Sequence, residues 1–346
     1  MAKQEFTPKT WEEFFDKKLT LDLPNDLSMN AYLKGANGPL LILVHGAGYS
    51  GLSWACLAQE LSQMIQCRIL APDLRGHGDT KSPDDADLSM DTLANDVKLL
   101  AENFLDQHEP EEQPQALILI GHLLGGAVAV NAAQSLSRIS GTCVLDVVEG
   151  TALEGLKMMH HFLSERPSRF KSLEQGIQWC VRSGRVRNLD SARVSMPGQL
   201  VPAASGPGVS LGQLSFNKAR LPGLPEQPEP EPKPEPKLEP GSVYKWRVDL
   251  AKTEPFWEGW FSCLSERFLA IPAAKLLILS GVERLDQTLT VGQMQGKFQM
   301  VVLTRASGQA VHEDSPKDVA EVLATFCVRN RFATALEGFT PVYYPS

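Results

Sequence analysis

One short segment, residues 116–127, constrains the fold of this chain more than any other. It reads Ala-Leu-Ile-Leu-Ile-Gly-His-Leu-Leu-Gly-Gly-Ala, an apolar run followed by a glycine turn and a second apolar stretch. The spacing is that of a nucleophile elbow, G-x-S-x-G, which joins a strand to a helix. Gly121 and Gly125 hold the two glycine positions, where small residues relieve crowding around a strained centre. Leu123 holds the position of the nucleophilic serine.

Short apolar runs alternate with helical patterns on both sides of this turn. Such runs are typical of strands that are buried on both faces of a sheet. The strands are expected at 39–44, 67–71, 116–120, 142–148, 275–280 and 298–303. The main helices are expected at 53–64, 88–105, 127–136, 173–181 and 315–330. This alternation predicts an α/β fold with a mostly parallel central sheet flanked by helices.

The domain organisation follows from where this alternation starts and stops. A single α/β domain is expected over residues 38–346, after an N-terminal extension of residues 1–37. Polar helices at 153–200 are expected to form a helical cap, and residues 201–242 a low-complexity Pro/Glu/Lys insert. Residues 225–240 hold seven prolines and seven charges, which cannot build a helix, strand or core. A disordered surface loop is favoured there over a proline-rich ligand for an adaptor domain.

Composition excludes several classes of function. The net charge of −8 argues against nucleic acid as a partner. The six cysteines are scattered with no C-x-x-C pair, which favours reduced thiols over a metal site or a disulfide framework. The charged N-terminus does not resemble a signal peptide, and no apolar run is long enough to span a membrane. A cytoplasmic or nuclear chain is expected, with no membrane, metal or cofactor.

The remaining triad positions are sought downstream of the elbow, in the order nucleophile, acid, base. His312 is the candidate base, because it follows the last expected strand and precedes the last helix. For the acid the residues alone leave alternatives. Asp146 ends an apolar strand, where a carboxylate needs a partner. Asp286 and Glu283 follow the next strand, although Asp286 equally suits a helix cap.

Two backbone N–H groups are expected to form the oxyanion hole. One belongs to Leu124, directly after the elbow centre, and the other to Ala47 in the glycine-rich loop 45–48. A glycine-rich loop after a strand can also cradle phosphate, but no Lys-Ser/Thr follows this one, so a P-loop is excluded. Ser50 and Ser53 lie near this loop. Neither is on an elbow, so replacement of the nucleophile by either is weakly supported.

Longer strings show a specific resemblance. They lie at 52–54, 146–152, 187–189, 191–196, 257–261, 292–299 and 310–314. On these strings the chain resembles the protein phosphatase methylesterases over most of its length outside the insert. The resemblance implies an α/β-hydrolase fold and removal of the methyl ester from the C-terminal leucine of the type 2A protein phosphatase catalytic subunit. The C-terminal tail of that subunit would then be the partner.

The resemblance also assigns roles by position. It places the catalytic acid on Asp146 and the base on His312, and it places the nucleophilic serine of G-H-S-M-G-G on Leu123. Two smaller departures are Gln309, where the family tends to have histidine, and Ala47, where it has a third glycine. Gln309 could alter the loop that presents His312, and Ala47 could tighten the oxyanion loop.

The leucine at position 123 decides which functions are possible for this chain. Leucine has no proton to give and no lone pair to attack an ester, so covalent catalysis at this residue is excluded. One hypothesis is a methylesterase whose serine has been lost in this sequence. The alternatives are a non-catalytic protein that keeps a phosphatase-binding surface and an unrelated α/β-hydrolase with another substrate.

Overall fold

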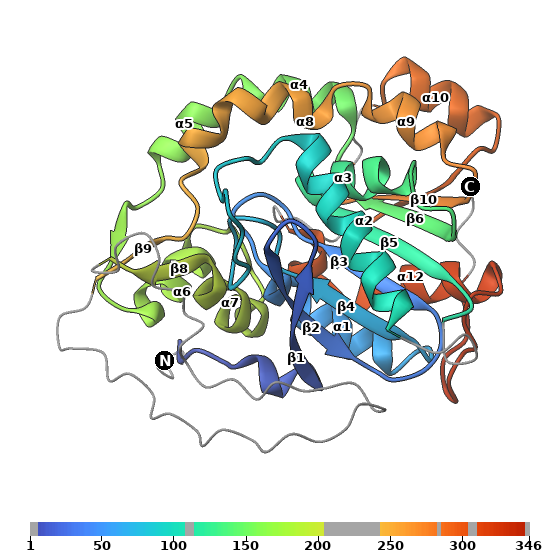
Figure 1. The fold of residues 1–346 in the computed structure, drawn as a ribbon, viewed down its shortest axis with the longest axis horizontal. Coiled ribbons are helices and arrows are strands. Elements are labelled where there is room, and N and C mark those ends of the chain that lie inside the picture. The colour runs from blue at the N-terminus through green and yellow to red at the C-terminus, as the bar shows by residue number, and fades with distance from the viewer. Residues whose placement is uncertain (1–5, 108–113, 204–242, 282–284, 304–309, 343–346) are drawn as a thin grey trace.

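An eight-stranded sheet forms the centre of the molecule (Figure 1). The computed structural model describes residues 6–107, 114–203, 243–281, 285–303 and 310–342. The strands are β1 (Lys17–Leu23), β2 (Leu27–Lys34), β3 (Leu40–Val44), β4 (Arg68–Pro72), β5 (Leu117–His122), β6 (Ile139–Leu145), β10 (Ala274–Leu279) and β11 (Gln299–Val302). They lie in the order β1-β2-β4-β3-β5-β6-β10-β11. All neighbours from β4 to β11 pair in parallel, which confirms the predicted α/β fold.

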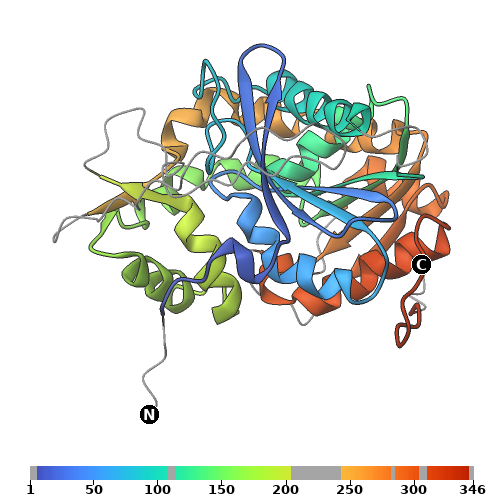
Figure 2. The same cartoon turned by 60° about the horizontal axis from the view of Figure 1, so that its bottom comes forward.

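Helices cover both faces of this sheet, because the parallel strands are apolar on both sides. In β3, Leu40, Ile42 and Val44 face one core, whereas Leu41 and Leu43 face the other. The first core contains residues of α2 (Met90–Asp106), α3 (Leu124–Ala133) and α9 (Leu264–Ala270). The second contains residues of α1 (Ala55–Ser62) and α12 (Pro316–Arg329). Figure 2 shows the sheet between these two helical layers.

The sheet begins earlier in the chain than the sequence suggested. Residues 17–34 were assigned to an N-terminal extension, but they form the β1–β2 hairpin, which pairs antiparallel with β4. In β1 the buried leucines alternate with exposed polar residues, as expected of a strand with one solvated face. Asn25 and Asp26 both have positive φ, 63° and 54°, as a tight hairpin turn requires.

A smaller unit lies beside the sheet and corresponds to the expected cap. It contains α4 (Glu149–Leu156), α5 (Met159–Ser164), α6 (Leu173–Arg182), α7 (Leu189–Ser195) and a three-stranded sheet of β7 (Arg169–Phe170), β8 (Leu200–Pro202) and β9 (Tyr244–Trp246). Strands β8 and β9 pair antiparallel, so the chain leaves toward the insert and returns at adjacent positions. Most of the predicted insert, residues 204–242, lies outside the described residues.

Three further helices lie along the described chain after the cap: α8 (Trp257–Phe261) comes between β9 and α9, α10 (Gln287–Met294) between β10 and β11, and α11 (Val311–Asp314) directly before α12. All six cysteines are free, and five of them are buried. In the described part of the chain, no helix combines the length and the apolar character needed to cross a membrane.

Candidate active site

The predicted elbow is present as a strand–turn–helix. Strand β5 ends at His122, α3 begins at Leu124, and Leu123 lies between them with φ 49° and ψ −119°. A Cβ on Gly121 would lie 2.0 Å from the carbonyl oxygen of Gly125, so this position must be glycine. A non-glycine residue at positive φ carries strain on the order of 1–3 kcal/mol. The chain therefore keeps a strained turn around a side chain that cannot act as a nucleophile.

A cavity of about 500 Å³ opens at this turn, between the sheet and the cap. Its wall contains Ala47, Leu123, Leu124 and Asp146, which are four of the five predicted site residues. Leu124 is the first residue of α3, so its N–H has no partner within the helix. This N–H lies at the positive end of the helix dipole, where a developing negative charge is stabilised.

The carboxylate of Asp146 lies at the carboxyl ends of two neighbouring strands. Asp146 follows β6 with φ 53°, and its Oδ1 accepts a hydrogen bond from the backbone N–H of Ser280, after β10. Asp286, the other candidate acid, instead caps α10, where its Oδ1 accepts from the N–H of Leu289 at 2.8 Å. The sequence allowed this capping role for Asp286, and the structure confirms it. Glu283 and Gln309 lie outside the described residues.

His312 does not join Asp146 in this structure. Its buried ring lies 4.1 Å from the ring of Trp54 and 4.5 Å from that of His122, measured between centroids. Neither ring nitrogen has a hydrogen-bond partner, and His312 is absent from the cavity wall. Burial, and then the charges of His122 and His45, hold the pKa of His312 well below its usual range. The buried ring therefore favours its neutral form.

The two serines near the glycine-rich loop 45–48 are not placed to replace the nucleophile. Ser50 and Ser53 are both buried, and neither lines the cavity. The hydroxyl of Ser53 donates to the carbonyl oxygen of Ser50 at 2.9 Å. Both residues belong to the scaffold behind the loop.

Two histidines that the sequence did not single out hold this loop. His45 Nε2 accepts the N–H of Leu74 at 2.9 Å, and His77 Nε2 accepts the N–H of Gly48 at 2.9 Å. Each Nδ1 donates to a backbone carbonyl at 2.8 Å. These contacts require neutral rings, and burial accordingly lowers the pKa of His77 to about 4 and that of His45 well below its usual range. In the sequence, His45 begins the run His-Gly-Ala-Gly at 45–48, and His77 lies within the run Arg-Gly-His-Gly at 75–78. A histidine among glycines shortly after a strand was the signal that could have identified both residues.

Asp73 ties the same loop to the sheet. Its carboxylate accepts from the N–H of Gly51 at 2.7 Å, the N–H of Asp79 at 2.9 Å and Nδ2 of Asn30 at 2.8 Å. Burial raises the pKa of Asp73, while these hydrogen bonds oppose the rise. Gly51 just after the glycine-rich loop, Asn30 on β2 and Asp79 in the turn after β4 therefore share one acceptor.

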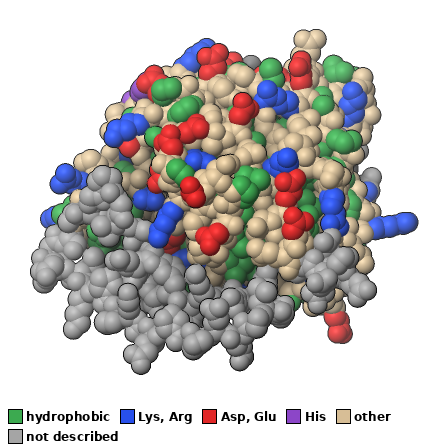
Figure 3. Space-filling view, viewed as in Figure 1, with side chains coloured by type: hydrophobic (Ala, Val, Ile, Leu, Met, Phe, Trp, Pro, Cys, Tyr) green, Lys and Arg blue, Asp and Glu red, His purple; other side chains and the backbone are tan. Residues whose placement is uncertain are grey.

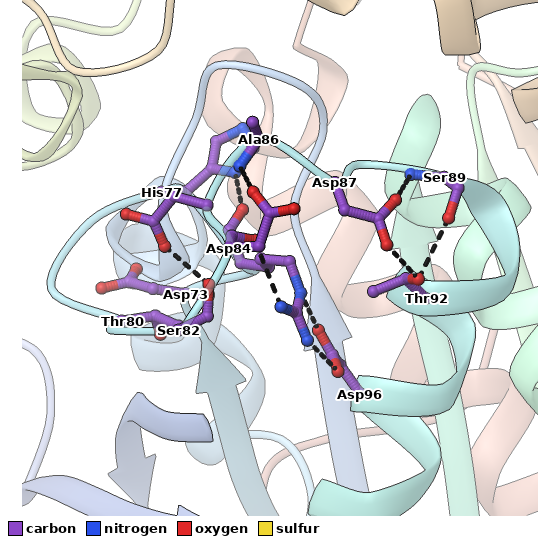
Figure 4. Close-up of polar contacts among 12 residues, drawn as sticks. Asp73, His77, Thr80, Ser82, Asp84, Ala86, Asp87, Ser89, Thr92 and Asp96 are labelled. Atoms are coloured by element: carbon purple, nitrogen blue, oxygen red, sulfur yellow. Dashed lines mark hydrogen bonds and ion pairs between the residues drawn. The ribbon is translucent and has the colours of Figure 1, made fainter. Parts of the chain in front are cut away.

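The turn after β4 is fixed further by a buried ion pair. Arg75 donates to both carboxylate oxygens of Asp96 on α2, at 2.8 and 2.9 Å, and to the carbonyl oxygen of Asp84 at 3.2 Å (Figure 4). A two-pronged pair of this kind fixes geometry as well as contributing energy. Across the described residues, no cluster of three or more His, Cys, Asp or Glu side chains could hold a metal ion.

Comparison with known proteins places this geometry in a family. The Alpha/beta hydrolase family matches residues 41–322. Among solved structures, an E-2-(acetamidomethylene)succinate hydrolase has a TM-score of 0.66 at 17% identity, covering 90% of this chain and 99% of that chain. A thioesterase domain from the curacin biosynthetic pathway has a TM-score of 0.60 at 16% identity, covering 89% and 98%. At these identities the likeness concerns the fold alone.

Curated relatives are much more similar in sequence. Protein phosphatase methylesterase 1 of Mus musculus is 44% identical, covering 99% of this chain and 90% of its own length. The Homo sapiens protein of the same name is also 44% identical with the same coverage. A probable protein phosphatase methylesterase 1 of Caenorhabditis elegans is 42% identical, covering 96% and 80%. The chain thus belongs to the protein phosphatase methylesterase family, within the α/β hydrolases.

Proposed function

We propose that this chain binds the C-terminal tail of the type 2A protein phosphatase catalytic subunit in the cavity at the elbow, and that Leu123 prevents hydrolysis of its methyl ester. The family membership supports a phosphatase as the partner. The absence of hydrolysis is supported by Leu123 itself, which lies at the elbow centre and in the wall of the cavity. The chain is then a phosphatase-binding pseudoenzyme with the architecture of an esterase.

The chemistry of the elbow explains the loss of activity. In a serine esterase the hydroxyl at this position gives its proton to a histidine and attacks the ester carbon, forming an acyl-enzyme. An isobutyl group can do neither. It also fills the space in which the attacking oxygen would lie, next to the N–H of Leu124. Bound ester would therefore remain intact, because the elbow offers no nucleophile to attack its carbonyl carbon.

The rest of the cavity supports binding. A volume of about 500 Å³ is within the range of ligand cavities, and most of the lining is apolar, from residues such as Leu156, Met159 and Trp260. A leucine methyl ester is itself apolar and would gain from burial there, at about 25 cal/mol per Å² of area removed from water. The side chain of Leu123 adds to this apolar surface.

Binding is tested directly by co-precipitation of the methylated phosphatase catalytic subunit with the unaltered chain. We expect capture of the subunit, with its methyl ester still present after incubation, as detected by mass spectrometry of the tail. The matched control is a variant with a blocked cavity, Gly155→Trp, at a wall position on α4 where a Cβ meets nothing within 4 Å. Failure to capture by a folded, unaltered chain contradicts the proposal. Loss of the methyl group also contradicts it and favours an active esterase.

A further inference from the structure

Two arginines face the cavity from the cap. Arg166 follows α5 and Arg185 follows α6, and both are in the wall. Among the described residues of that wall Asp146 is the only acidic one, and its carboxylate accepts the N–H of Ser280 at the elbow end. The outer surface contrasts with this arrangement, because acidic and basic side chains are interspersed over the face seen in Figure 3.

Aromatic rings hold both guanidinium groups in place. The Cζ of Arg166 lies 3.7 Å from the ring centroid of Trp246, on β9. The Cζ of Arg185 lies 4.0 Å from the ring of Phe162 and 5.0 Å from that of Trp179. Stacking of this kind orients a guanidinium group through its face.

The charge of Arg166 has no acidic partner in the described protein. None of the ion pairs or side-chain hydrogen bonds involves its guanidinium, and its buried Nε has no hydrogen-bond partner. Burial, followed by the charge of Arg185, lowers the pKa of Arg166 to about 10. Two neighbouring cations in a partly apolar wall destabilise each other, and a partly buried cation without an acceptor is costly. A negatively charged ligand would relieve both effects.

We propose that Arg166 and Arg185 form a carboxylate-binding subsite of this cavity, which selects peptide ligands that carry a carboxylate at a distance from the elbow. The planar guanidinium group matches the two oxygens of a carboxylate. The carboxylate can come from an acidic side chain or from a free chain end, and both present the same group. The inference rests on the proposed function only in assuming that a peptide occupies the cavity. A purely structural role, in which the arginines pack on the aromatic rings, would leave binding indifferent to ligand charge.

The test is calorimetric titration of the unaltered chain with matched peptides. One pair is acetyl-Leu-Glu-Leu-amide and acetyl-Leu-Gln-Leu-amide, which differ only in an internal carboxylate. The other pair is acetyl-Leu-Leu-Leu with a free carboxylate and the same peptide as an amide. We expect the acid of at least one pair to bind about 10-fold to 100-fold more tightly than its neutral partner, since hydrogen bonds to charged groups are the strong ones. The pair that discriminates identifies the source of the carboxylate.

Variants locate the effect. Arg166→Gln and Arg185→Gln are each expected to reduce the acid preference to about 3-fold or less, because the neutral side chain loses the charge-assisted pair. Arg166→Lys retains the charge and is expected to keep an intermediate preference, which guards against a folding defect in the glutamine variant. Arg182→Gln is the matched control, because Arg182 is an exposed arginine at the end of α6, three residues before Arg185, and it should leave the preference unchanged.

Three results would overturn the proposal: equal binding of acid and amide in both pairs, an acid preference that survives in Arg166→Gln and Arg185→Gln, or no binding of any peptide up to its solubility limit. The peptides contain neither an ester nor a phosphatase sequence. Failure to capture the phosphatase subunit would therefore not contradict the peptide preference. Equal binding of the acidic and neutral peptides would likewise not contradict capture of the phosphatase subunit.

Discussion

The turn after β4 and the surroundings of His312 are both buried, and both combine histidines with carboxylates, yet they differ in how their polar groups are satisfied. In the turn, Asp73 accepts three hydrogen bonds and both ring nitrogens of His77 are engaged. Around His312, both of its ring nitrogens, Nε1 of Trp54 and both carboxylate oxygens of Glu313 have no hydrogen bond.

This difference is what we expect if the turn after β4 has a structural role and the surroundings of His312 have a functional one. A satisfied buried network fixes one geometry, whereas each unsatisfied buried group costs about 1–3 kcal/mol. Burial raises the pKa of Glu313 to about 8, and the Ser195 hydroxyl, which lies close but outside hydrogen-bonding geometry, offsets part of the rise. Selection for stability alone would replace such groups with apolar ones. The surroundings of His312 therefore keep costly polar groups in a chain whose elbow has leucine at its centre.

The largest expected effect comes from removing a hydrogen-bond acceptor in the turn after β4. Asp73→Ala leaves the N–H groups of Gly51 and Asp79 without their acceptor, so we expect a loss of about 4 kcal/mol in the free energy of unfolding. Ser50→Ala removes a buried hydroxyl that has no hydrogen bond and should change stability by about 0.5 kcal/mol or less. Urea unfolding measures both. Similar losses for the two variants would contradict the difference between buried groups that are hydrogen-bonded and buried groups that are not.

In the surroundings of His312, where buried polar groups have no hydrogen bond, Glu313→Gln is expected to stabilise the protein above neutral pH. The pKa of Glu313 is raised in the folded state, so its contribution is present below the unfolded value of 4.5 and is lost as the pH rises toward about 8. At pH 7 this loss amounts to roughly 3 kcal/mol. Glutamine carries no such charge, so the advantage of the variant should grow between about pH 5 and pH 8. A constant difference across this range would show that Glu313 is not buried in its neutral form.

A smaller effect of opposite sign is expected from His77, in the turn after β4. The pKa of His77 is lowered from 6.5 to about 4, so its contribution is present above 6.5 and is lost as the pH falls through 4. The unaltered protein should lose about 2 kcal/mol from this residue by pH 5. In His77→Gln, where an amide oxygen can still accept the N–H of Gly48, the acid-side slope should be shallower. Parallel stability curves would contradict the assignment of a neutral His77.

The smallest effect concerns the strain at the elbow. At φ 49° glycine is less strained than alanine, so Leu123→Gly should be about 1 kcal/mol more stable than Leu123→Ala. In an ordinary helix the order is the reverse. The two variants control for each other, because both remove the leucine side chain. Thermal unfolding with alanine as the more stable variant would show that the turn relaxes when leucine is removed.

Much of the fold could be predicted because its signals are local. Continuous apolar runs identified the six parallel strands, and the G-x-x-x-G spacing located the elbow at Leu123. The β1–β2 hairpin was missed because Lys17, Lys18 and Asp22 give that segment a polar appearance. The short strands of the cap were missed because two or three residues carry no periodicity.

The site was harder to predict, since it depends on how side chains from distant segments meet. The order nucleophile, acid, base along the chain made Asp146 and His312 candidates for the acid and the base. It could not show that His312 packs on Trp54 with no hydrogen bond. The cap arginines were not singled out either, because Arg166 and Arg185 come from separate connections and meet only in the folded chain.

The central claim is that the chain has the architecture of a methylesterase but no nucleophile at position 123. It is tested most directly by measuring labelling with a serine-directed fluorophosphonate probe for the unaltered chain and for Leu123→Ser, side by side. We expect no labelling of the unaltered chain. We expect labelling of the variant, together with hydrolysis of a methylated phosphatase tail, once His312 comes within hydrogen-bond reach of the new hydroxyl, about 2.6–3.2 Å. Robust labelling of the unaltered chain, or a folded variant that stays inert to probe and ester, would contradict the account.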